Sequence, residues 1–240
     1  MLLDLDYLNK TYELNIFGIA HVGAHTGSEI PIYIKNFSDV PMYLFEPQNE
    51  VFSDLVENVT KYKNVQCFNF GLGAENKRVT FYKNTNNDSQ SSSVLKPKEH
   101  LKYHPHVKFE KSKDIDIKTL DSLENISVNF LNLDVQGYEL EVLKGSINTL
   151  KKIDFILTEV NRKELYEKCV LINELDKFLD NQGFLRCETK WWNNTGTWGD
   201  AFYIKKTKLS FLNINLIKFK NRIKLVKVFF FIKKYFVSKY

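Results

Sequence analysis

Two glycines and one acid, placed after two apolar runs, constrain the fold of this chain more than any other feature. The run 18–22 leads into Gly23 and Gly27, and the run 43–45 leads into Glu46, nineteen residues after Gly27. Glycines after a strand let the backbone approach a ligand closely, and an acid after the next strand accepts hydrogen bonds from two ribose hydroxyls. The pattern predicts a βαβ unit that binds a nucleoside.

The spacing of the glycines favours one nucleoside cofactor over another. Gly23 and Gly27 follow the pattern G-x-x-x-G, whereas a dinucleotide with a pyrophosphate is typically bound by G-x-G-x-x-G. S-adenosylmethionine carries no pyrophosphate, so we expect S-adenosylmethionine and disfavour an NAD-dependent oxidoreductase. Gly71 and Leu72 follow the third apolar run, where their backbone amides would flank the adenine unless the segment is only a turn.

Apolar runs with the character of strands alternate with helical patterns along the chain. This alternation predicts an α/β fold with a Rossmann-like, mostly parallel sheet and helices on both faces, and a ligand at the carboxyl ends of the strands. We expect strands at 16–22, 41–45, 65–70, 78–82, 129–135 and 155–160, with a closing antiparallel pair at 183–190 and 200–205. We expect helices at 28–35 (capped by Thr26 or Ser28), 49–62, 119–123, 138–150, 162–168 and 171–182.

The net charge of +5 averages two unlike parts of the chain. Residues 205–240 hold eleven of the 34 basic residues and no acid, which leaves 23 basic against 29 acidic residues elsewhere, a net charge of −6. The mildly acidic part argues against nucleic-acid binding. We expect an N-terminal extension (1–17), a methyltransferase domain (18–206) that uses the expected S-adenosylmethionine, and a basic amphipathic tail (207–240).

The tail has the pattern of an amphipathic helix. Apolar residues recur at steps of three and four along one face, and most lysines and arginines lie off it: the apolar set is Leu212, Leu216, Phe219, Ile223, Val226 and Phe230. A basic helix of this kind binds the interface of an anionic membrane. The alternative is a helix that docks on the domain or on a second copy of the chain, as a homo-oligomer.

Cysteine usage and the N-terminus indicate the compartment. Cys67, Cys169 and Cys187 are odd in number and scattered, which is typical of free thiols in a reducing compartment. The first residues carry acids where a secretory signal needs basic residues, and no uncharged run reaches the roughly 18 residues of a membrane span. We expect a cytoplasmic protein, peripheral at the inner membrane face if the tail binds lipid.

Seven sequence pieces, in order, carry a family resemblance. They are His21-Val22-Gly23-Ala24-His25-Thr26-Gly27, Phe45-Glu46-Pro47, Ser91-Ser92-Ser93, Thr119-Leu120-Asp121-Ser122-Leu123, the stretch from Leu133-Asp134-Val135-Gln136-Gly137 to Gly145, Glu159-Val160-Asn161, and Gly183-Phe184. Over residues 18–205 the chain resembles the FkbM-type methyltransferases, a branch of the class I S-adenosylmethionine-dependent enzymes. The resemblance implies O-methylation, usually of a sugar or polyketide hydroxyl. Many relatives place Asp where His21 stands, so an acidic contact to the amino acid end of the cofactor is absent or altered.

The predicted cofactor site follows the strand ends. Gly23, Ala24 and Gly27 would line the methionine and ribose portions, and Glu46 would bind the ribose diol; the alternatives are an ordinary tight turn and a solvated loop acid. The full predicted set is His21, Gly23, Ala24, His25, Gly27, Glu46, Pro47, Gly71, Leu72, Ser92 and Asp134.

Asp134 and Glu159 are the predicted catalytic residues. Each acid ends an apolar run, so both should lie at the carboxyl edge of the sheet. Either Asp134 or Glu159 would accept the proton of an acceptor hydroxyl as a base, or bind that hydroxyl. The alternative for Asp134 is a cap on the helix that begins near Tyr138.

Two groups of side chains could in principle bind a metal ion, one at the predicted catalytic acids and one at three histidines. Asp134, Glu159 and Asn161 would suit magnesium, which the family resemblance does not require, so a divalent metal is not expected and any metal ligands are left unknown. The group His100, His104 and His106 suggests zinc, but Pro105 interrupts any helix and no Cys or acid nearby completes a tetrahedral set.

The acceptor site is predicted in two loops. The polar stretch 84–113, with Ser91, is typical either of a functional lid or of a flexible loop. Aromatic faces beside amides and hydroxyls hold sugars, which points to Trp191, Trp192, Trp198, Asp200 and Asn161; the alternatives are tryptophans in the core and an Asp200 paired with a base.

The sequence therefore predicts an S-adenosylmethionine-dependent O-methyltransferase acting on the hydroxyl of a nucleotide sugar or glycan. An O-methyltransferase of a polyketide or lipid hydroxyl is the alternative enzyme. An inactive, membrane-tethered binding module with the same fold is the alternative from another class.

Overall fold

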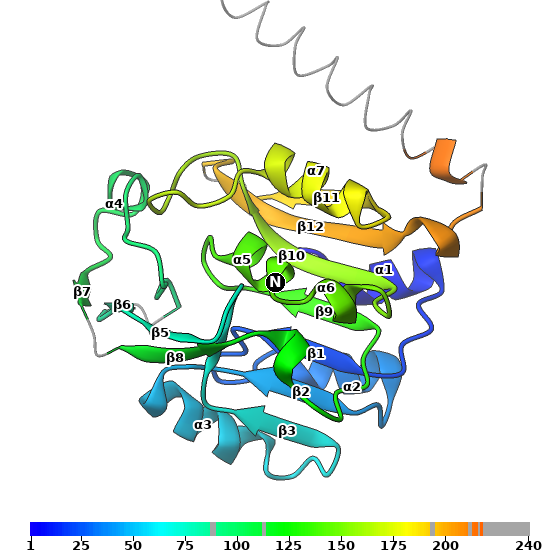
Figure 1. Ribbon diagram of the computed structural model, residues 1–240, viewed down its shortest axis with the longest axis horizontal. Coiled ribbons are helices and arrows are strands. Elements are labelled where there is room, and N and C mark those ends of the chain that lie inside the picture. Colours follow the sequence, from blue (N-terminus) through cyan, green and yellow to red (C-terminus); the bar gives the residue numbers. More distant parts are fainter. Residues whose placement is uncertain (87–89, 112–113, 193–194, 211–212, 216, 218–240) are drawn as a thin grey trace, which may run out of the picture.

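A seven-stranded sheet forms the centre of the computed structural model, which describes residues 1–86, 90–111, 114–192, 195–210, 213–215 and 217 (Figure 1). The strand order is β11-β12-β10-β9-β1-β2-β3. The parallel strands are β1 (Ile19–Val22), β2 (Met42–Phe45), β3 (Val65–Phe68), β9 (Phe130–Leu133) and β10 (Phe155–Asn161). β12 (Trp198–Lys205) runs antiparallel to both β10 and β11 (Phe184–Trp191). The mostly parallel sheet and its closing antiparallel pair are confirmed.

Helices cover both faces of this sheet, because alternate strand residues point to opposite sides. On one side Val22, Leu131 and Ile156 share a core with α5 (Glu139–Lys144), α6 (Ile147–Leu150) and α7 (Ile172–Asn181). On the other side Ile19 and Leu157 pack with α1 (Leu5–Tyr12), α2 (Ile30–Phe37) and α3 (Asn49–Val59). The expected α/β architecture is confirmed, with α1 as an element that the sequence reading did not foresee.

The chain makes a long excursion between β3 and β9. β4 (Gly71–Leu72), β5 (Lys77–Val79) and β8 (Ile115–Lys118) form a three-stranded sheet, and β6 (Tyr82–Asn84) pairs with β7 (Phe109–Lys111). Figure 1 shows β6, β7 and α4 (His100–Tyr103) together on the left of the molecule, away from the edge strand β11. The predicted polar connection 84–113 therefore carries secondary structure of its own.

Two predicted helices are wrong. The helix over 138–150 breaks into α5 and α6 because the backbone leaves helical geometry at Gly145 (ψ 8°) and Ser146 (φ −125°). Glycine is required at position 145, where a Cβ would lie 1.9 Å from the carbonyl oxygen of Gly73. The segment 162–168 is not helical. Its Tyr166 is fully buried, and Lys168 has a φ of 60°, in the left-handed region that a right-handed helix does not use.

The predicted caps have mixed outcomes. Neither Thr26 nor Ser28 caps α2; its N-cap is Glu29, which makes no side-chain capping bond. The short turn predicted at 119–123 is confirmed as a 3-10 helix, Leu120–Ser122, where the side chain of Thr119 accepts a hydrogen bond from the backbone of Ser122.

The predicted amphipathic tail lies almost entirely outside the described residues. Within the part of the chain that the structure describes, no helix combines the length and the apolar character needed to span a bilayer.

The close approach at Gly23 gives a first prediction. Gly23 and Gly183 share left-handed φ values of 80° and 85°, but a Cβ on Gly23 would lie 1.9 Å from the carbonyl oxygen of Asp134, whereas one on Gly183 meets only Lys205 at 3.8 Å. Gly183→Ala should lower the free energy of unfolding by about 1–2 kcal/mol, the cost of the left-handed backbone. Gly23→Ala should cost roughly 1–3 kcal/mol more, because of overpacking. Equal losses in urea unfolding would contradict this account.

Candidate functional site

A cavity of about 620 Å³ opens at the carboxyl ends of β1, β2, β9 and β10. The parallel pairing brings these ends to one edge of the sheet, so residues far apart in sequence line one space. The segment 90–94 and the histidines of α4 and the turn after it form another wall. The predicted position of the site is therefore where the structure has its cavity.

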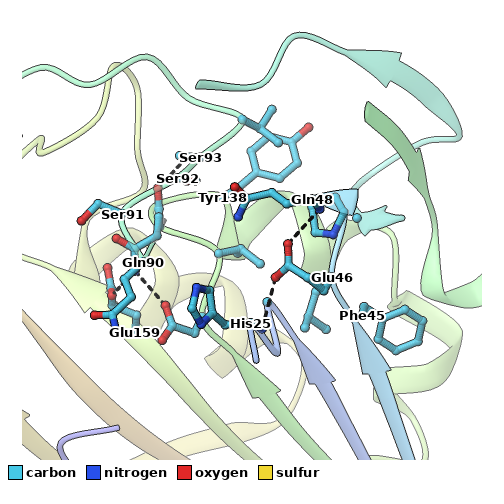
Figure 2. Close-up of a pocket in the computed structure, with 18 of the residues that line it drawn as sticks. His25, Phe45, Glu46, Gln48, Gln90, Ser91, Ser92, Ser93, Tyr138 and Glu159 are labelled. Atoms are coloured by element: carbon cyan, nitrogen blue, oxygen red, sulfur yellow. Dashed lines mark hydrogen bonds between the residues drawn. The ribbon is translucent and has the colours of Figure 1, made fainter. Parts of the chain in front are cut away.

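Glu46 follows β2 and projects into this cavity, although only 3% of the residue is exposed. Figure 2 shows its carboxylate between His25 and Gln48. Oε2 accepts a hydrogen bond from the backbone N–H of His25 at 3.1 Å, and Oε1 accepts one from the backbone N–H of Gln48 at 2.9 Å. Burial raises the pKa of Glu46, and the two backbone donors oppose that shift. A carboxylate has about four acceptor positions, so these bonds leave capacity for a ligand's hydroxyls.

An apolar wall lies beside Glu46. It is formed by Phe45, Leu72, Phe81, Ile115, Ile117 and Tyr138. Gly71 and Leu72 line the cavity as predicted, but they form β4, paired with Ile117 and Lys118, and do not make a simple turn. A Cβ on Gly71 would lie 2.6 Å from Cδ1 of Ile117, so a larger residue there would displace the end of the Ile117 side chain. The apolar and aromatic side chains of this wall could pack against an aromatic base.

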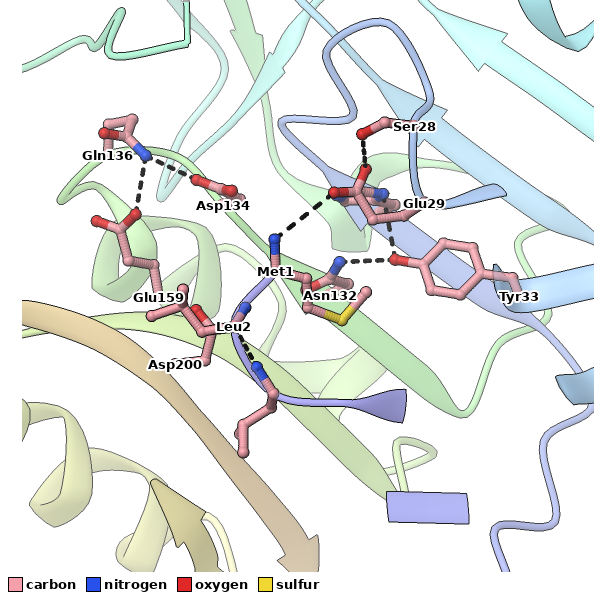
Figure 3. A network of polar contacts seen from close by, with 12 residues as sticks. Met1, Leu2, Ser28, Glu29, Tyr33, Asn132, Asp134, Gln136, Glu159 and Asp200 are labelled. Carbon is pink, nitrogen blue, oxygen red and sulfur yellow. Dashed lines mark hydrogen bonds and ion pairs between the residues drawn. The ribbon is translucent and has the colours of Figure 1, made fainter. Parts of the chain in front are cut away.

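His21 closes the floor of the cavity. Its ring is buried, its Nδ1 lies 3.3 Å from the hydroxyl of Tyr33, and the side-chain amide of Asn132 donates to that hydroxyl at 2.6 Å. Burial lowers the pKa of His21 to about 4, so its imidazole is neutral near pH 7. The carboxylate of Glu29 opposes this lowering of the His21 pKa. Its Oε1 lies 3.8 Å from the amino group of Met1 (Figure 3).

Asp134 and Glu159 meet through a third side chain, Gln136. Its Nε2 donates to Oδ1 of Asp134 and to Oε2 of Glu159, both at 2.8 Å (Figure 3). The Asp134 side chain is exposed, facing the cavity, yet the protein around it removes enough water to raise its pKa to about 6. Glu159 is buried, and burial together with the neighbouring Asp134 raises its pKa well above the usual range.

Asp134 does not cap the following helix. The N-cap of α5 is Tyr138, which makes no capping bond, and Glu139 organises the turn instead. Oε1 of Glu139 accepts hydrogen bonds from the backbone N–H groups of Gly137 at 3.0 Å and Val135 at 3.3 Å. The alternative structural role for Asp134 is therefore wrong, and its carboxylate faces the cavity.

Asp200 and two tryptophans line a further part of the cavity. The rings of Trp192 and Trp198 stack with centroids 5.4 Å apart and an interplanar angle of 13°. Oδ2 of Asp200 accepts backbone hydrogen bonds from Leu2 and from Leu3, the latter at 3.0 Å. The N-terminal segment is thereby tied into the cavity wall, a contact that sequence alone did not predict.

Ser91, Ser92 and Ser93 are buried, and all three line the cavity (Figure 2). Oγ of Ser92 accepts a hydrogen bond from the backbone of Asn84 at 2.9 Å, and Oγ of Ser93 donates to the backbone carbonyl of Gln136 at 2.9 Å. The serines therefore belong to an ordered wall and not to an isolated loop.

The three histidines also line the cavity. The ring centroids of His100 and His104 lie 4.8 Å apart, and those of His104 and His106 lie 6.2 Å apart. Burial lowers the pKa of His100 to about 4. Among the described residues, no set of three or more His, Cys, Asp or Glu side chains has the arrangement of a metal site.

Most predicted site residues meet in this cavity, and four do not line it. The lining residues from the prediction are His21, Gly23, His25, Glu46, Pro47, Gly71, Leu72, Ser91, Ser92, Asp134, Glu159, Trp192, Trp198 and Asp200. The four that do not line it are Ala24, Gly27, Asn161 and Trp191. Ala24 is fully buried, and a Cβ on Gly27 would contact Leu55 of α3. Trp191 instead packs against Arg162, whose guanidinium lies 3.7 Å from the ring centroid. Asn161 is fully buried beneath the surface and does not reach the cavity.

The polar lining residues that the sequence reading did not assign to the site include Glu29, Gln48, Gln90 and Gln136. Gln136 stands inside the quoted stretch after Asp134, and Gln48 follows Glu46-Pro47, so position next to a motif was the available signal.

Comparison with known proteins agrees with this geometry. Residues 21–186 match the methyltransferase FkbM domain. The chain belongs to the FkbM methyltransferase family. This stretch contains Glu46, Asp134, Gln136 and Glu159.

Individual relatives are more distant. The chain is 29% identical over 160 residues to a 2-O-methyltransferase, NoeI, of Sinorhizobium fredii, covering 62% of this chain and 65% of the relative. It is 26% identical over 127 residues to a hexuronic acid methyltransferase, AglP, of Haloferax volcanii, covering 50% of this chain and 47% of the relative. The matches thus span less than two thirds of either relative.

A solved structure supports the fold. The crystal structure of an FkbM methyltransferase from Methylobacillus flagellatus KT superposes with a TM-score of 0.53 at 14% identity, covering 78% of this chain and 43% of that chain. The expected class I methyltransferase fold is therefore confirmed.

The raised pKa of Glu159 predicts how stability depends on pH. The folded protein holds a proton on Glu159 that the unfolded chain releases above its ordinary pKa of 4.5, so wild-type stability falls as the pH rises from there. Glu159→Gln is neutral at every pH and keeps an acceptor for Gln136. We expect its free energy of unfolding, relative to wild type, to increase from pH 4.5 to pH 8.

The matched control for this measurement is Glu164→Gln. Glu164 is paired with Lys98, which lowers the pKa of its carboxyl, so its contribution is present above the ordinary pKa and lost as the pH falls. The control should lose a little stability at neutral pH. A difference for Glu159→Gln that stays flat or declines with pH would contradict the assigned burial.

Proposed function

We propose that this protein transfers the methyl group of S-adenosylmethionine to a hydroxyl of a sugar, either in a nucleotide sugar or in a glycan. The observation that carries the proposal is a single cavity that joins Glu46, the acid pair Asp134–Glu159 and the stacked tryptophans. Membership of the FkbM family supports the proposal. So do the names of the two relatives, one a 2-O-methyltransferase and the other a hexuronic acid methyltransferase.

The residues around Glu46 fit the donor. The carboxylate would accept hydrogen bonds from the two ribose hydroxyls, while Phe45, Leu72 and Ile117 would enclose the adenine. Gly23 lines the cavity at the end of β1, where the methionine and ribose portions of the donor would pass. Glu29 lies beside the neutral His21 and would attract the ammonium of the methionine portion.

The acid pair fits the chemistry. The bound donor supplies a methyl carbon activated by its sulfonium charge. The acceptor oxygen must be aligned with that carbon and must lose its proton. Asp134, whose pKa of about 6 suits a base near neutral pH, would take the proton, and the buried Glu159 would hold the acceptor hydroxyl or share that proton.

The acceptor half of the cavity fits a sugar. The stacked faces of Trp192 and Trp198 offer an apolar platform, and Ser91 and Asp200 add polar groups around it. A sugar ring presents apolar C–H faces and hydroxyl edges, which match such a surface. A flat apolar acceptor would have less use for the acids and serines.

Two parts of the proposal rest on the sequence. We propose that 18–206 is the catalytic domain, that 1–17 is an extension completing its cavity wall, and that 207–240 is a tail making peripheral contact with anionic membranes. The alternative for the tail, docking on the domain or on a second copy, is separated from this by salt-sensitive sedimentation with anionic vesicles.

A labelled-donor assay tests the reaction. Wild-type protein, methyl-labelled S-adenosylmethionine and a panel of nucleotide sugars, glycans, polyketides and lipids should yield label in a saccharide. Asp134→Asn preserves the hydrogen bond to Gln136 but removes the charge, and turnover should fall about 100-fold or more.

The control for this assay is Asp116→Asn. Asp116 stands on β8 between the cavity residues Ile115 and Ile117, and its exposed carboxylate pairs with Arg78 at 3.1 Å. Its turnover should match wild type. Label found only in polyketides or lipids would overturn the sugar assignment, and normal turnover by Asp134→Asn would overturn the role of Asp134.

A further inference from the structure

Gln136 uses every polar atom of its side chain inside the site. Nε2 donates its two hydrogens to Asp134 and Glu159, each at 2.8 Å, and Oε1 lies 3.0 Å from the hydroxyl of Tyr166. Because both acid oxygens lie 2.8 Å from one nitrogen, they are at most 5.6 Å apart. An amide that bridges two acids in this way fixes both of their positions.

The backbone is shaped to place this side chain. Gln136 has a φ of 54°, a left-handed conformation that few residues other than glycine adopt, and Gly137 follows with a φ of 97°. The buried Glu139 holds the turn through the backbone N–H groups of Val135 and Gly137. The turn brings Gln136 between Asp134, after β9, and Glu159, on β10 (Figure 3).

Gln136 also joins the acid pair to the cavity wall at 91–93. The hydroxyl of the fully buried Tyr166 lies 2.8 Å from the backbone carbonyl of Ser91 as well as near Oε1 of Gln136. The hydroxyl of Ser93 donates to the backbone carbonyl of Gln136 at 2.9 Å. Segment 91–93 is therefore fixed relative to the two acids through one residue.

The charges that surround the acid pair are mostly of the same sign. The titratable groups acting on it from neighbouring elements are Glu29, Glu139, Asp200, the hydroxyl of Tyr166 and the amino group of Met1. Like charges repel in a space poor in water, so the two acids would move apart or take up protons without a donor between them. The amide of Gln136 is a neutral donor that reaches both acids.

We propose that Gln136 is the positioning residue of this site: it sets the separation of Asp134 and Glu159 and holds segment 91–93 over them. The inference rests on the proposed methyl transfer, in which these two acids act on the acceptor hydroxyl. Gln136 does not itself take up a proton. It keeps the acid that does so aligned with the acceptor.

The test compares Gln136→Met with Tyr166→Phe. Methionine keeps the length of the side chain and removes its donors. Phenylalanine keeps the donors of Gln136 and removes the hydroxyl that contacts both its Oε1 and the backbone carbonyl of Ser91. Gln136→Met should lower kcat about 10- to 100-fold, with the KM for donor and acceptor changed less than about threefold, because misplaced reacting groups affect turnover more than binding. Tyr166→Phe should show a smaller loss of the same kind.

A pH profile separates positioning from simple loss of stability. The N–H groups of Gln136 stabilise the charged form of both acids, so their removal raises the pKa of the pair. The rising limb of kcat/KM against pH should therefore move to higher pH in Gln136→Met. Tyr203→Phe is the control: its buried hydroxyl donates to Asp176 at 2.8 Å, away from the cavity, and its profile should match wild type.

A crystal structure of Gln136→Met gives a readout that does not need activity. The proposal predicts that the carboxylates of Asp134 and Glu159 move apart and that segment 91–93 shifts. Unmoved carboxylates, or a kcat and pH profile equal to wild type, would overturn it. If wild type methylates no acceptor, the proposed reaction fails, and the crystallographic comparison alone still decides whether Gln136 positions the acids.

Discussion

The tight junction of β1, β2 and β9 at Gly23 is the constraint on which the rest of the site depends. The backbone N–H of Gly23 donates to the carbonyl of Phe45 at 2.9 Å, and the N–H of Asp134 donates to the carbonyl of Val22 at 2.9 Å. These bonds end three parallel strands at one level. Glu46 and Asp134, the next residues along two of the strands, consequently face the same cavity. A side chain at position 23 would force the strands apart.

The site gathers three acids where the protein excludes water. Their desolvation lowers the stability of the fold, and a carboxyl group whose pKa is raised in this way suits proton transfer near neutral pH. The pKa values of Glu46, Asp134 and Glu159 are all raised, chiefly because the protein around them excludes solvent. Two different arrangements hold them. Two backbone N–H groups donate to the carboxylate of Glu46 and oppose the rise of its pKa, and the amide of Gln136 bridges the other two acids. Groups held against their solvation preference are typical of functional sites, where stability is lower than the fold alone would allow.

Sequence reasoning succeeded where the signal is local. The strands around Gly23 and Glu46 could be predicted because apolar runs, glycines and a following acid lie within one short stretch. Sequence reasoning failed where contacts with segments distant in sequence accompany the local backbone conformation. At the break in the predicted helix, Gly145 packs against the backbone of Gly73, which is distant in sequence. In the irregular segment 162–168, Tyr166 is buried and its hydroxyl donates to the backbone carbonyl of Ser91. Likewise Trp191 packs against Arg162 whereas Trp192 faces the cavity, a difference of one residue that composition cannot reveal.

Calorimetric titration tests most directly whether this cavity binds S-adenosylmethionine with its ribose on Glu46. Wild type should bind the donor, and Glu46→Ala should bind it about 10- to 100-fold more weakly, because hydrogen bonds to a charged group contribute roughly 1.5–3 kcal/mol. Glu57→Ala, which removes an exposed acid from α3, should bind as wild type does. No binding by wild type, or equal affinity in Glu46→Ala, would contradict the account.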